Sequence, residues 1–147
     1  MRAITPYEQG FLEGLIDGEG SLYISKWTNR GRVTVNRGWQ PMIRLSIHST
    51  TPELLEKAAI ILKKPVRDLG HTNGVTRKRM YRIELSHNIL RWLLPQVSFS
   101  IPEKERRRLL ALKILDLLNL GTNRYTDNSA HDAELTLLYN DFKLGEK

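Results

Sequence analysis

Two carboxylates and three evenly spaced glycines lie together near the N-terminus. Gly10, Gly14 and Gly18 recur every four residues, so they share one face of any helix that spans them. Glycine inside a helix costs about 0.5 to 1 kcal/mol relative to alanine, whereas small residues at this spacing allow two helices to approach closely. Asp17 and Glu19 follow at the expected helix end, where carboxylates and exposed carbonyl oxygens suit a hard cation such as Mg²⁺. The segment therefore predicts a helix-packing face beside a metal site.

A simpler interpretation of this segment is an ordinary helix that ends in glycine and exposes two acids to solvent. Two acids at a helix C-terminus oppose the helix dipole, however, and need a compensating charge, which a bound cation supplies. The histidines have no spacing typical of metal ligands and are interpreted as structural or surface residues; they are His48, His71, His87 and His131.

The hydrophobic pattern predicts helices and strands that would position these residues. Thr5, Pro6 and Glu8 form an N-cap, a first-turn proline and a capping box, so the first helix is expected from there to residue 17 or 18. Further helices are expected over residues 52–62, 88–94, 103–120 (opened by a capping box from Ser100 to Glu103) and 130–143, and strands over 21–27, 40–49, 66–71 and 77–86. This order predicts one α+β domain over residues 1–147, an antiparallel sheet with helices packed on one face.

The positive charge is concentrated in the middle of the chain. The formal net charge is +7, with five basic residues and no acid over residues 21–52, and seven basic residues against one acid over residues 63–82. From residue 116 to the end, six acids outnumber three bases. Because clustered Lys and Arg displace the counterions of nucleic acid, a polyanion is expected to bind the middle of the chain.

Several classes of protein are disfavoured by composition. The chain has no cysteine, which excludes disulfides, thiolate metal sites and a cysteine nucleophile. No apolar run approaches the roughly 20 residues of a membrane span, and residues 1–7 do not resemble a secretory signal. An intracellular protein without a membrane partner is expected, in the cytoplasm, the nucleoid or an organelle matrix.

Residues 12–20, with the sequence LEGLIDGEG, resemble the LAGLIDADG motif of homing endonucleases and related intron maturases. The glycines and both acids match the motif. Glu13 and Gly18 stand where the motif has alanine, and Glu19 stands where it has its final aspartate. The order of elements that follows is similar to the family over nearly the whole chain, which implies a homing-endonuclease-like helix-β-β-helix-β-β-helix fold with DNA on the open face of the sheet.

The resemblance also implies an assembly. Only one copy of the motif is present, which in this family implies a homodimer with the two motif helices packed at the two-fold axis. Asp17 matches the first acid of the motif, which is more structural than catalytic in the family. The residues expected at the dimer interface are Gly10, Gly14, Asp17 and Gly18. A charged Glu13 is a departure, because a carboxylate buried there needs a partner.

Site residues follow from the same resemblance. Glu19 takes the place of the acid that binds the essential metal, and the carbonyl of Gly18 would assist it. Lys104 falls where the family carries a basic residue near the scissile phosphates, and Ser49 matches a polar position that helps to order active-site water. The neighbouring run from Arg106 to Arg108 is interpreted equally well as a phosphate contact or as an ordinary helix face.

The polar face of the predicted sheet carries residue types that read DNA. Arginine recognises guanine and glutamine recognises adenine in the major groove, which a two-stranded ribbon fits. A loop over residues 29–38 is expected to extend this grip. The predicted DNA-binding residues are Tyr23, Ser25, Trp27, Arg30, Arg32, Arg37, Gln40, Arg44, Ser46, His48, Arg77, Arg79 and Arg82.

The predicted function is a site-specific double-strand DNA endonuclease of the intron or intein homing type. It would cut a long, partly palindromic target and leave 3′ overhangs, with Mg²⁺ as cofactor, Mn²⁺ as a substitute, and Ca²⁺ supporting binding without cleavage. Two alternatives remain open at this stage: an RNA maturase whose partner is intron RNA, and a non-catalytic DNA-binding regulator on the same scaffold.

Overall fold

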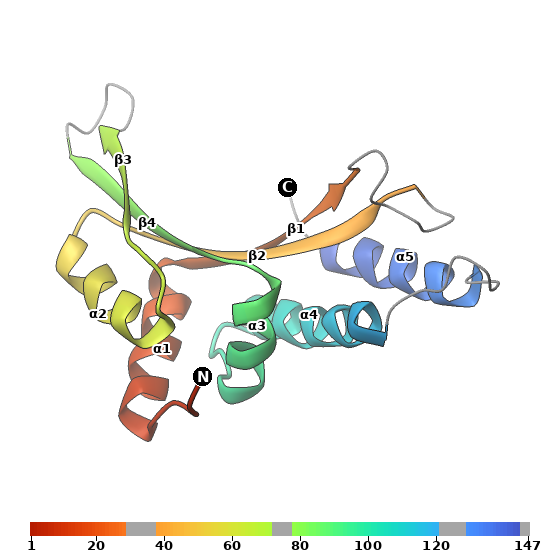
Figure 1. The fold of residues 1–147 in the computed structure, drawn as a ribbon, viewed down its shortest axis with the longest axis horizontal. Coiled ribbons are helices and arrows are strands. Elements are labelled where there is room, and N and C mark those ends of the chain that lie inside the picture. The colour runs from red at the N-terminus through yellow and green to blue at the C-terminus, as the bar shows by residue number, and fades with distance from the viewer. Residues whose placement is uncertain (29–37, 72–77, 121–128, 145–147) are drawn as a thin grey trace.

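The expected order of helices and strands is confirmed by the computed structural model, which describes residues 1–28, 38–71, 78–120 and 129–144. The elements, labelled in Figure 1, are α1 (Pro6–Glu19), β1 (Gly20–Trp27), β2 (Gln40–Ser49), α2 (Pro52–Leu62), β3 (Arg67–His71), β4 (Arg79–Leu85), α3 (His87–Leu93), the short 3₁₀ helix η1 (Leu94–Gln96), α4 (Pro102–Leu120) and α5 (Ser129–Lys143). Most predicted boundaries differ from the observed ones by one or two residues, as helix and strand ends commonly do.

The strands form a four-stranded antiparallel sheet in the order β1-β2-β4-β3. Gly20 pairs with Ile47 and Trp27 pairs with Gln40, so β1 is paired with β2 along its full length. Because the side-chain period of a strand is two, this register places Leu22, Ile24 and Ile43 on one face of the sheet. The residues that alternate with these along each strand point to the opposite face.

Among the described residues, the helices cover one face of the sheet and the other face is open (Figure 1). The core lies between these two layers, and Leu12, Leu45, Ile83 and Phe142 are completely buried in it. In Figure 1 the sheet curves away from the helices at both ends, so the open face is a trough. The predicted α+β fold with helices on one face is confirmed.

Helix α1 begins at the predicted capping box. The hydroxyl of Thr5 accepts the backbone N–H of Glu8 at 3.2 Å, and the Glu8 carboxylate accepts the backbone N–H of Thr5 at 2.9 Å. The pair satisfies two N–H groups that have no partner within the helix. The residues between this cap and Glu19 form 14 residues of continuous helix, so the glycines of the motif do not interrupt it.

Helix α4 begins one residue earlier than expected, at Pro102. Proline is favoured at the first helical position because it has no N–H to satisfy there. Ser100 is therefore one residue too early to be the N-cap, and its backbone N–H is donated to the carboxylate of Asp17 at 3.0 Å. None of the helices in the described part of the chain combines the length and apolar character of a membrane span.

Candidate active site and nucleic-acid interface

Glu19 occupies a tight corner where α1 turns directly into β1. A Cβ atom added to Gly20 would lie 2.8 Å from the side chain of Ile16 and 2.9 Å from its backbone, so only glycine allows the strand to start this close to the last helical turn. Gly18 and Glu19 are exposed at this corner, whereas Gly20 is buried. The local sequence thus holds one carboxylate at the junction between the helical layer and the sheet.

Lys104 of α4, one of the predicted catalytic residues, lies at the same corner. Its Nζ donates hydrogen bonds to the carbonyl oxygens of Ile16 at 2.8 Å and Asp17 at 2.6 Å. These carbonyls belong to the negative end of α1, which a cation stabilises. Burial lowers the pKa of Lys104 below its usual value, and the nearby carboxylates of Asp17 and Glu19 partly oppose this shift. The structure therefore brings a cation to the two acids of the motif.

The carboxylate of Asp17 faces its own chain, and its place at a dimer interface stays a prediction. It accepts the backbone N–H of Ser100 at 3.0 Å and that of Ile101 at 3.4 Å. These N–H groups precede α4, where the helix dipole favours a negative charge. The negative charge of Asp17 is unfavourable at the C-terminus of α1, but its position near the N-terminus of α4 compensates for this. Its position is thus that of a link between two helices.

Glu13 has a partner of the same kind. Its Oε2 accepts the backbone N–H of Ser98 at 2.8 Å and the hydroxyl of Ser98 at 3.0 Å. Glu13 and Asp17 are one helical turn apart, so both acids hold the segment of residues 98–101 against α1. The charge of Glu13 is therefore satisfied within the chain.

The three glycines form a different side of α1. Gly10, Gly14 and Gly18 are exposed, and a Cβ atom added at any of them would have no atom within 4 Å apart from its own helix. Packing within the described chain therefore does not require glycine at these positions, although each glycine weakens the helix. We call the surface formed by Gly10, Gly14 and Gly18 the glycine face.

The oxygen donors at the corner fit a hard cation. Glu19 supplies an exposed carboxylate, and Lys104 engages the carbonyls of Ile16 and Asp17 but not that of Gly18. In the part of the chain that the structure describes, no three His, Cys, Asp or Glu residues gather as metal ligands. This donor set does not suit zinc, which needs three or four protein ligands. It suits Mg²⁺, which is held by one or two carboxylates together with water and phosphate oxygens.

Ser49 lies at the end of β2 on the helix-covered side of the sheet. It is 8% exposed, and its hydroxyl accepts the backbone N–H of Thr51 at 3.0 Å. This bond shapes the turn into α2, whose expected N-cap, Thr51, makes no side-chain capping bond. A role for Ser49 in ordering water remains a prediction.

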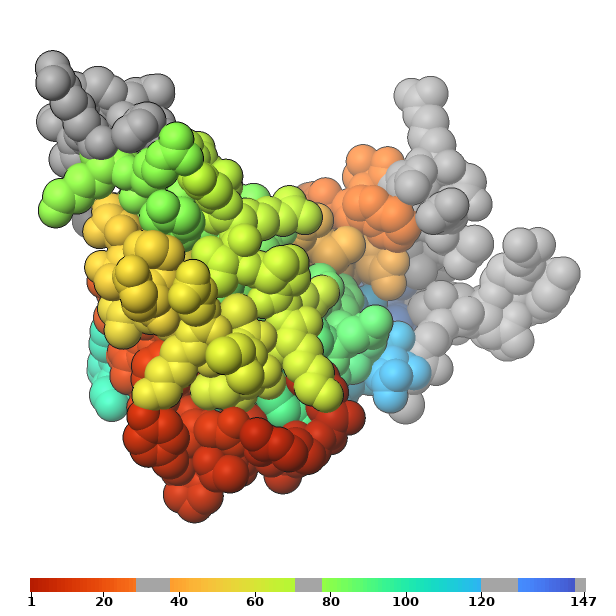
Figure 2. Space-filling model, turned by 60° about the vertical axis from the view of Figure 1, so that its left-hand side comes forward, coloured from red at the N-terminus to blue at the C-terminus, as the bar shows by residue number. Residues whose placement is uncertain are grey.

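The open face of the sheet carries most of the residues predicted to bind DNA. Strand alternation and register place on it, from three strands, Ser21, Tyr23, Ser25, Trp27, Gln40, Met42, Arg44, Ser46, His48, Met80, Arg82 and Glu84. Arginine, glutamine, serine, histidine and aromatic side chains dominate this set. In the space-filling view of Figure 2 the surface is hollowed between the green residues of β3 and β4 and the orange residues of β1.

The remaining predicted DNA-binding residues are not all exposed on this face. Arg79 has the strand parity of Tyr81 and Ile83, so it leaves β4 on the helix side, where its Nη1 lies 2.5 Å from Oδ2 of Asp68. Ser46 is only 4% exposed and donates its hydroxyl to Glu84 at 3.4 Å. The predicted residues Arg30, Arg32, Arg37 and Arg77, and the loop and turn that carry them, lie outside the described residues.

Glu84 is the residue of the open face that sequence reasoning missed. Its Oε1 lies 2.9 Å from Nη1 of Arg44, and its Oε2 accepts the hydroxyls of Tyr23 at 3.3 Å and Ser46 at 3.4 Å. The Nη1 of Arg82 is 3.6 Å from the same Oε2. The alternation of Arg82, Ile83, Glu84 and Leu85 could have revealed the acid, because Glu84 has the same parity as Arg82.

The side chains of Arg106, Arg107 and Arg108 bond to their own helix and to neighbouring elements of the same chain. Arg106 pairs with Glu103 and donates to carbonyls near the end of α5, and Arg108 pairs with Glu105 and donates to the carbonyl of Leu94 at 2.9 Å. Arg107 donates to the carbonyl of Leu22 at 3.3 Å. These bonds favour the ordinary structural interpretation of the run.

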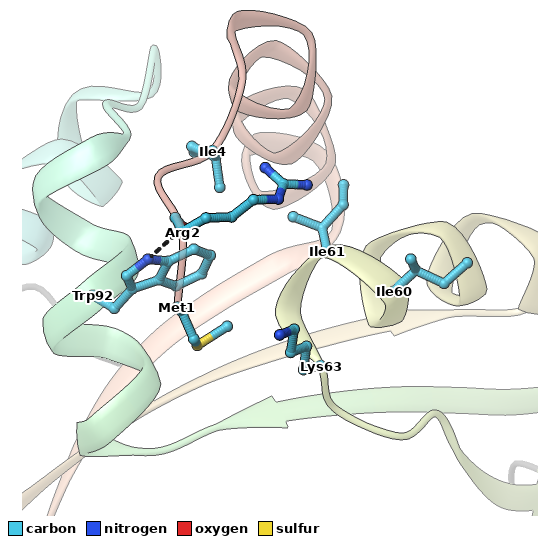
Figure 3. Close-up of a pocket in the computed structure, with 7 residues that line it drawn as sticks. All are labelled: Met1, Arg2, Ile4, Ile60, Ile61, Lys63 and Trp92. Atoms are coloured by element: carbon cyan, nitrogen blue, oxygen red, sulfur yellow. Dashed lines mark hydrogen bonds between the residues drawn. The ribbon is translucent and has the colours of Figure 1, made fainter.

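Two cavities differ in their position relative to the site. One of about 40 Å³ lies far from the open face, between the N-terminus, α2 and Trp92, whose Nε1 donates to the carbonyl of Arg2 (Figure 3). The other, of about 230 Å³, borders the open face and is lined by Arg44, Lys64, Pro65, Arg67, Glu84 and Ser86. Only the second cavity is bordered by residues of the candidate interface.

Solved structures share this fold. I-CeuI, a homing endonuclease encoded by a group I intron and complexed with DNA, has a TM-score of 0.68 and 19% identity over 99% of this chain and 70% of I-CeuI. The homing endonuclease I-TnaI has a TM-score of 0.67 and 15% identity over 99% of this chain and 92% of I-TnaI. I-SmaMI, a LAGLIDADG homing endonuclease, has a TM-score of 0.66 and 19% identity over 98% of this chain, which spans 46% of I-SmaMI.

At these identities the likeness establishes the fold that this chain shares with homing endonucleases. The sequence matches no protein-family model. A search of curated proteins likewise found no match.

Proposed function

We propose that this protein is a LAGLIDADG homing endonuclease that acts as a homodimer and cuts both strands of a specific DNA site by metal-dependent hydrolysis. The observation that carries the proposal is the corner at which α1 enters β1. There an exposed acid, Glu19, lies beside the ammonium group of Lys104 at the edge of a polar, open sheet face. The solved structures with this fold include homing endonucleases complexed with DNA, which supports the same class of substrate.

The residues at the corner suit phosphodiester hydrolysis. Glu19, with the carbonyl of Gly18, would hold Mg²⁺. When bound, the metal would polarise the phosphate and lower the pKa of a water molecule. Hydrogen bonds to two carbonyl oxygens hold the ammonium group of Lys104 in place. The cation beside Glu19 is therefore already positioned. A preorganised cation stabilises the negative charge that develops on the phosphate and the leaving 3′ oxygen.

The open face supplies recognition. Arg44, Gln40 and His48 project from β2 into a trough that no helix covers. A curved two-stranded ribbon with such side chains fits the major groove of DNA. Because the charge of the chain is concentrated in these strands and their connections, phosphate contacts would add to base contacts.

The glycine face supplies the dimer contact. The cost of three helical glycines is unexplained by packing within the described chain and is explained if a second α1 helix packs there. A two-fold axis through this face would place two copies of Glu19 near each other, one for each DNA strand, and would require a partly palindromic target.

The proposal is tested by selecting cut plasmids from a randomised, partly palindromic library, with Mg²⁺ and with EDTA. Wild-type protein is expected to yield linear DNA with 3′ overhangs only with the metal. Glu19→Gln should lose cleavage while it still binds the selected site in Ca²⁺. The matched control is Glu56→Gln, which makes the same charge change at an exposed position of α2.

Each alternative result has a distinct meaning. Normal cleavage by Glu19→Gln would overturn the site assignment. Selected DNA that is bound but never cut by the wild type would indicate a DNA-binding regulator. Absence of any DNA preference, together with binding of intron RNA, would indicate a maturase.

A further inference from the structure

We propose that Arg44 and Glu84 act as one unit that reads a single G·C base pair in the DNA target. The inference rests on the proposed function, since it concerns how the open face recognises DNA. It starts from the position of Glu84, an acid in the middle of a polar face with a chain charge of +7. A carboxylate repels DNA phosphates, so its presence there needs a physical reason.

The carboxylate of Glu84 is held in a fixed orientation. Arg44 donates to Oε1 at 2.9 Å, and the hydroxyls of Tyr23 and Ser46 donate to Oε2 at 3.3 and 3.4 Å. These partners come from β1 and β2, whereas Glu84 belongs to β4. Ser46 is almost fully buried beneath this network. The carboxylate is thus held by side chains of two other strands. A mobile surface ion pair would have a single partner.

Hydrogen-bonding capacity remains on both members of the pair. A carboxylate oxygen has about two acceptor sites, and Arg44 uses one of those on Oε1. Arg44 contacts Glu84 through Nη1, its side chain is 43% exposed, and an arginine has five N–H donors, so donors remain for a ligand. The pair therefore presents arginine donors beside a carboxylate acceptor on the open face.

This arrangement matches the major-groove edge of a G·C pair. Guanine presents two acceptors, N7 and O6, and its cytosine partner presents the donor N4 beside them. Arginine donates to guanine, and glutamate accepts from cytosine N4. Each half of the protein pair thus has a partner on one half of the base pair, whereas an A·T pair presents a different pattern.

The cavity beside the pair favours a base over an isolated phosphate. Its volume is about 230 Å³, and Lys64 and Arg67 line it together with Arg44 and Glu84. A site for phosphate alone would have no use for the acid. This lining of two further cations and a donor–acceptor pair fits a nucleotide whose base edge meets the pair while its backbone meets the lysine and arginine.

The experiment measures binding in Ca²⁺ to the selected site and to variants with each base pair replaced in turn. Wild-type protein is expected to lose about 5- to 150-fold in affinity at one G·C position per half-site. Arg44→Ala and Glu84→Ala should each abolish the preference at that same position. Glu84→Gln, which keeps an acceptor oxygen, should restore part of it, and Glu56→Ala on α2 controls for the change in charge.

Base analogues assign the two contacts separately. Replacing guanine by 7-deazaguanine removes N7, which should weaken DNA binding by the wild type but not by Arg44→Ala. Replacing deoxycytidine by 2′-deoxyzebularine, which has hydrogen in place of the 4-amino group, removes N4 and should weaken binding by the wild type but not by Glu84→Ala. The inference would be overturned, with the proposed function left intact, if the two variants lost their base preference at different positions. It would also be overturned if Glu84→Ala remained as sensitive to the cytosine analogue as the wild type. A wild-type protein that binds no DNA would instead overturn the proposed function.

Discussion

The two sides of helix α1 differ in whether they contact other parts of the same chain. On one side, Glu13 and Asp17 bind the segment before α4 through backbone N–H groups. On the other side, the glycine face leaves open space at each Cβ position. Both sets repeat at a spacing of four residues, so spacing alone does not distinguish an internal link from an external surface. The difference shows that a motif side chain acquires its role from what the fold places opposite it.

The largest expected effect is on the external side. In Gly14→Arg, a long charged side chain would block the approach of a second α1 helix, so the dissociation constant of the proposed dimer should rise by more than about 100-fold, or about 2.7 kcal/mol. The stability of the monomer should not fall, because the added Cβ meets no atom and glycine disfavours helix. Sedimentation equilibrium measures the first quantity and urea unfolding the second.

The matched control for Gly14→Arg is Glu56→Arg, which places the same side chain at an exposed position of α2. An unchanged dimer in Gly14→Arg would show that the glycine face is not the interface.

A smaller effect is expected on the internal side when Lys104 is replaced by methionine. The substitution removes two hydrogen bonds from a cation to the carbonyls of Ile16 and Asp17 and should lower the free energy of unfolding by about 1.5 to 3 kcal/mol. Lys113→Met, at an exposed position of the same helix, is the control and should change it little. Equal effects of the two substitutions in urea unfolding would contradict the assigned role of Lys104 at the helix end.

Asp17 tests the same side through a single carboxylate. Asp17→Ala leaves the N–H groups of Ser100 and Ile101 without their acceptor, and the loss should be about 0.5 to 2 kcal/mol, as for a helix cap. Asp17→Asn keeps one acceptor oxygen and should lose less. Sedimentation should show that the proposed dimer persists in both variants, and dissociation in Asp17→Asn would instead assign Asp17 to the interface.

The smallest expected effect comes from His87, which lies on neither side of α1. Its Nε2 accepts the backbone N–H of Ile43 at 3.0 Å, and burial together with the nearby cations Arg91 and Arg44 lowers its pKa below the usual 6.5. The unfolded chain therefore binds a proton before the folded chain does, and stability should decrease as pH falls below about 6.5. Urea unfolding from pH 7 to about pH 5 should show this slope, and His87→Gln should flatten it.

This pH window separates His87 from the acids on the surface of the molecule. Ion pairs lower the pKa of Glu103 and Glu105, and Arg2 holds that of Glu8 at about 2, all from a usual value of 4.5. Their contributions are present above pH 4.5 and are lost only in stronger acid. A slope between pH 5 and 6.5 that survives in His87→Gln would contradict the assignment to His87.

Sequence patterns were most informative where the chain has a strict period. Thr5, Pro6 and Glu8 predicted the start of α1 because a capping box depends on neighbours three residues apart. The alternation of Ile43, Leu45 and Ile47 predicted which face of β2 is buried, since a strand has a period of two. These features depend on local geometry and survive any change in the surrounding fold.

The sequence by itself determined the helix–strand order, the basic middle of the chain and the presence of two acids at the end of a glycine-rich helix. Only the tertiary structure decided which groups these side chains meet. Asp17 binds the backbone of residues 100 and 101, and Glu84 lies among Arg44, Tyr23 and Ser46 from other strands. The physical reason is that a carboxylate is stabilised by whichever donors reach it, and here those donors are brought near by chain folding across 38 to 84 residues.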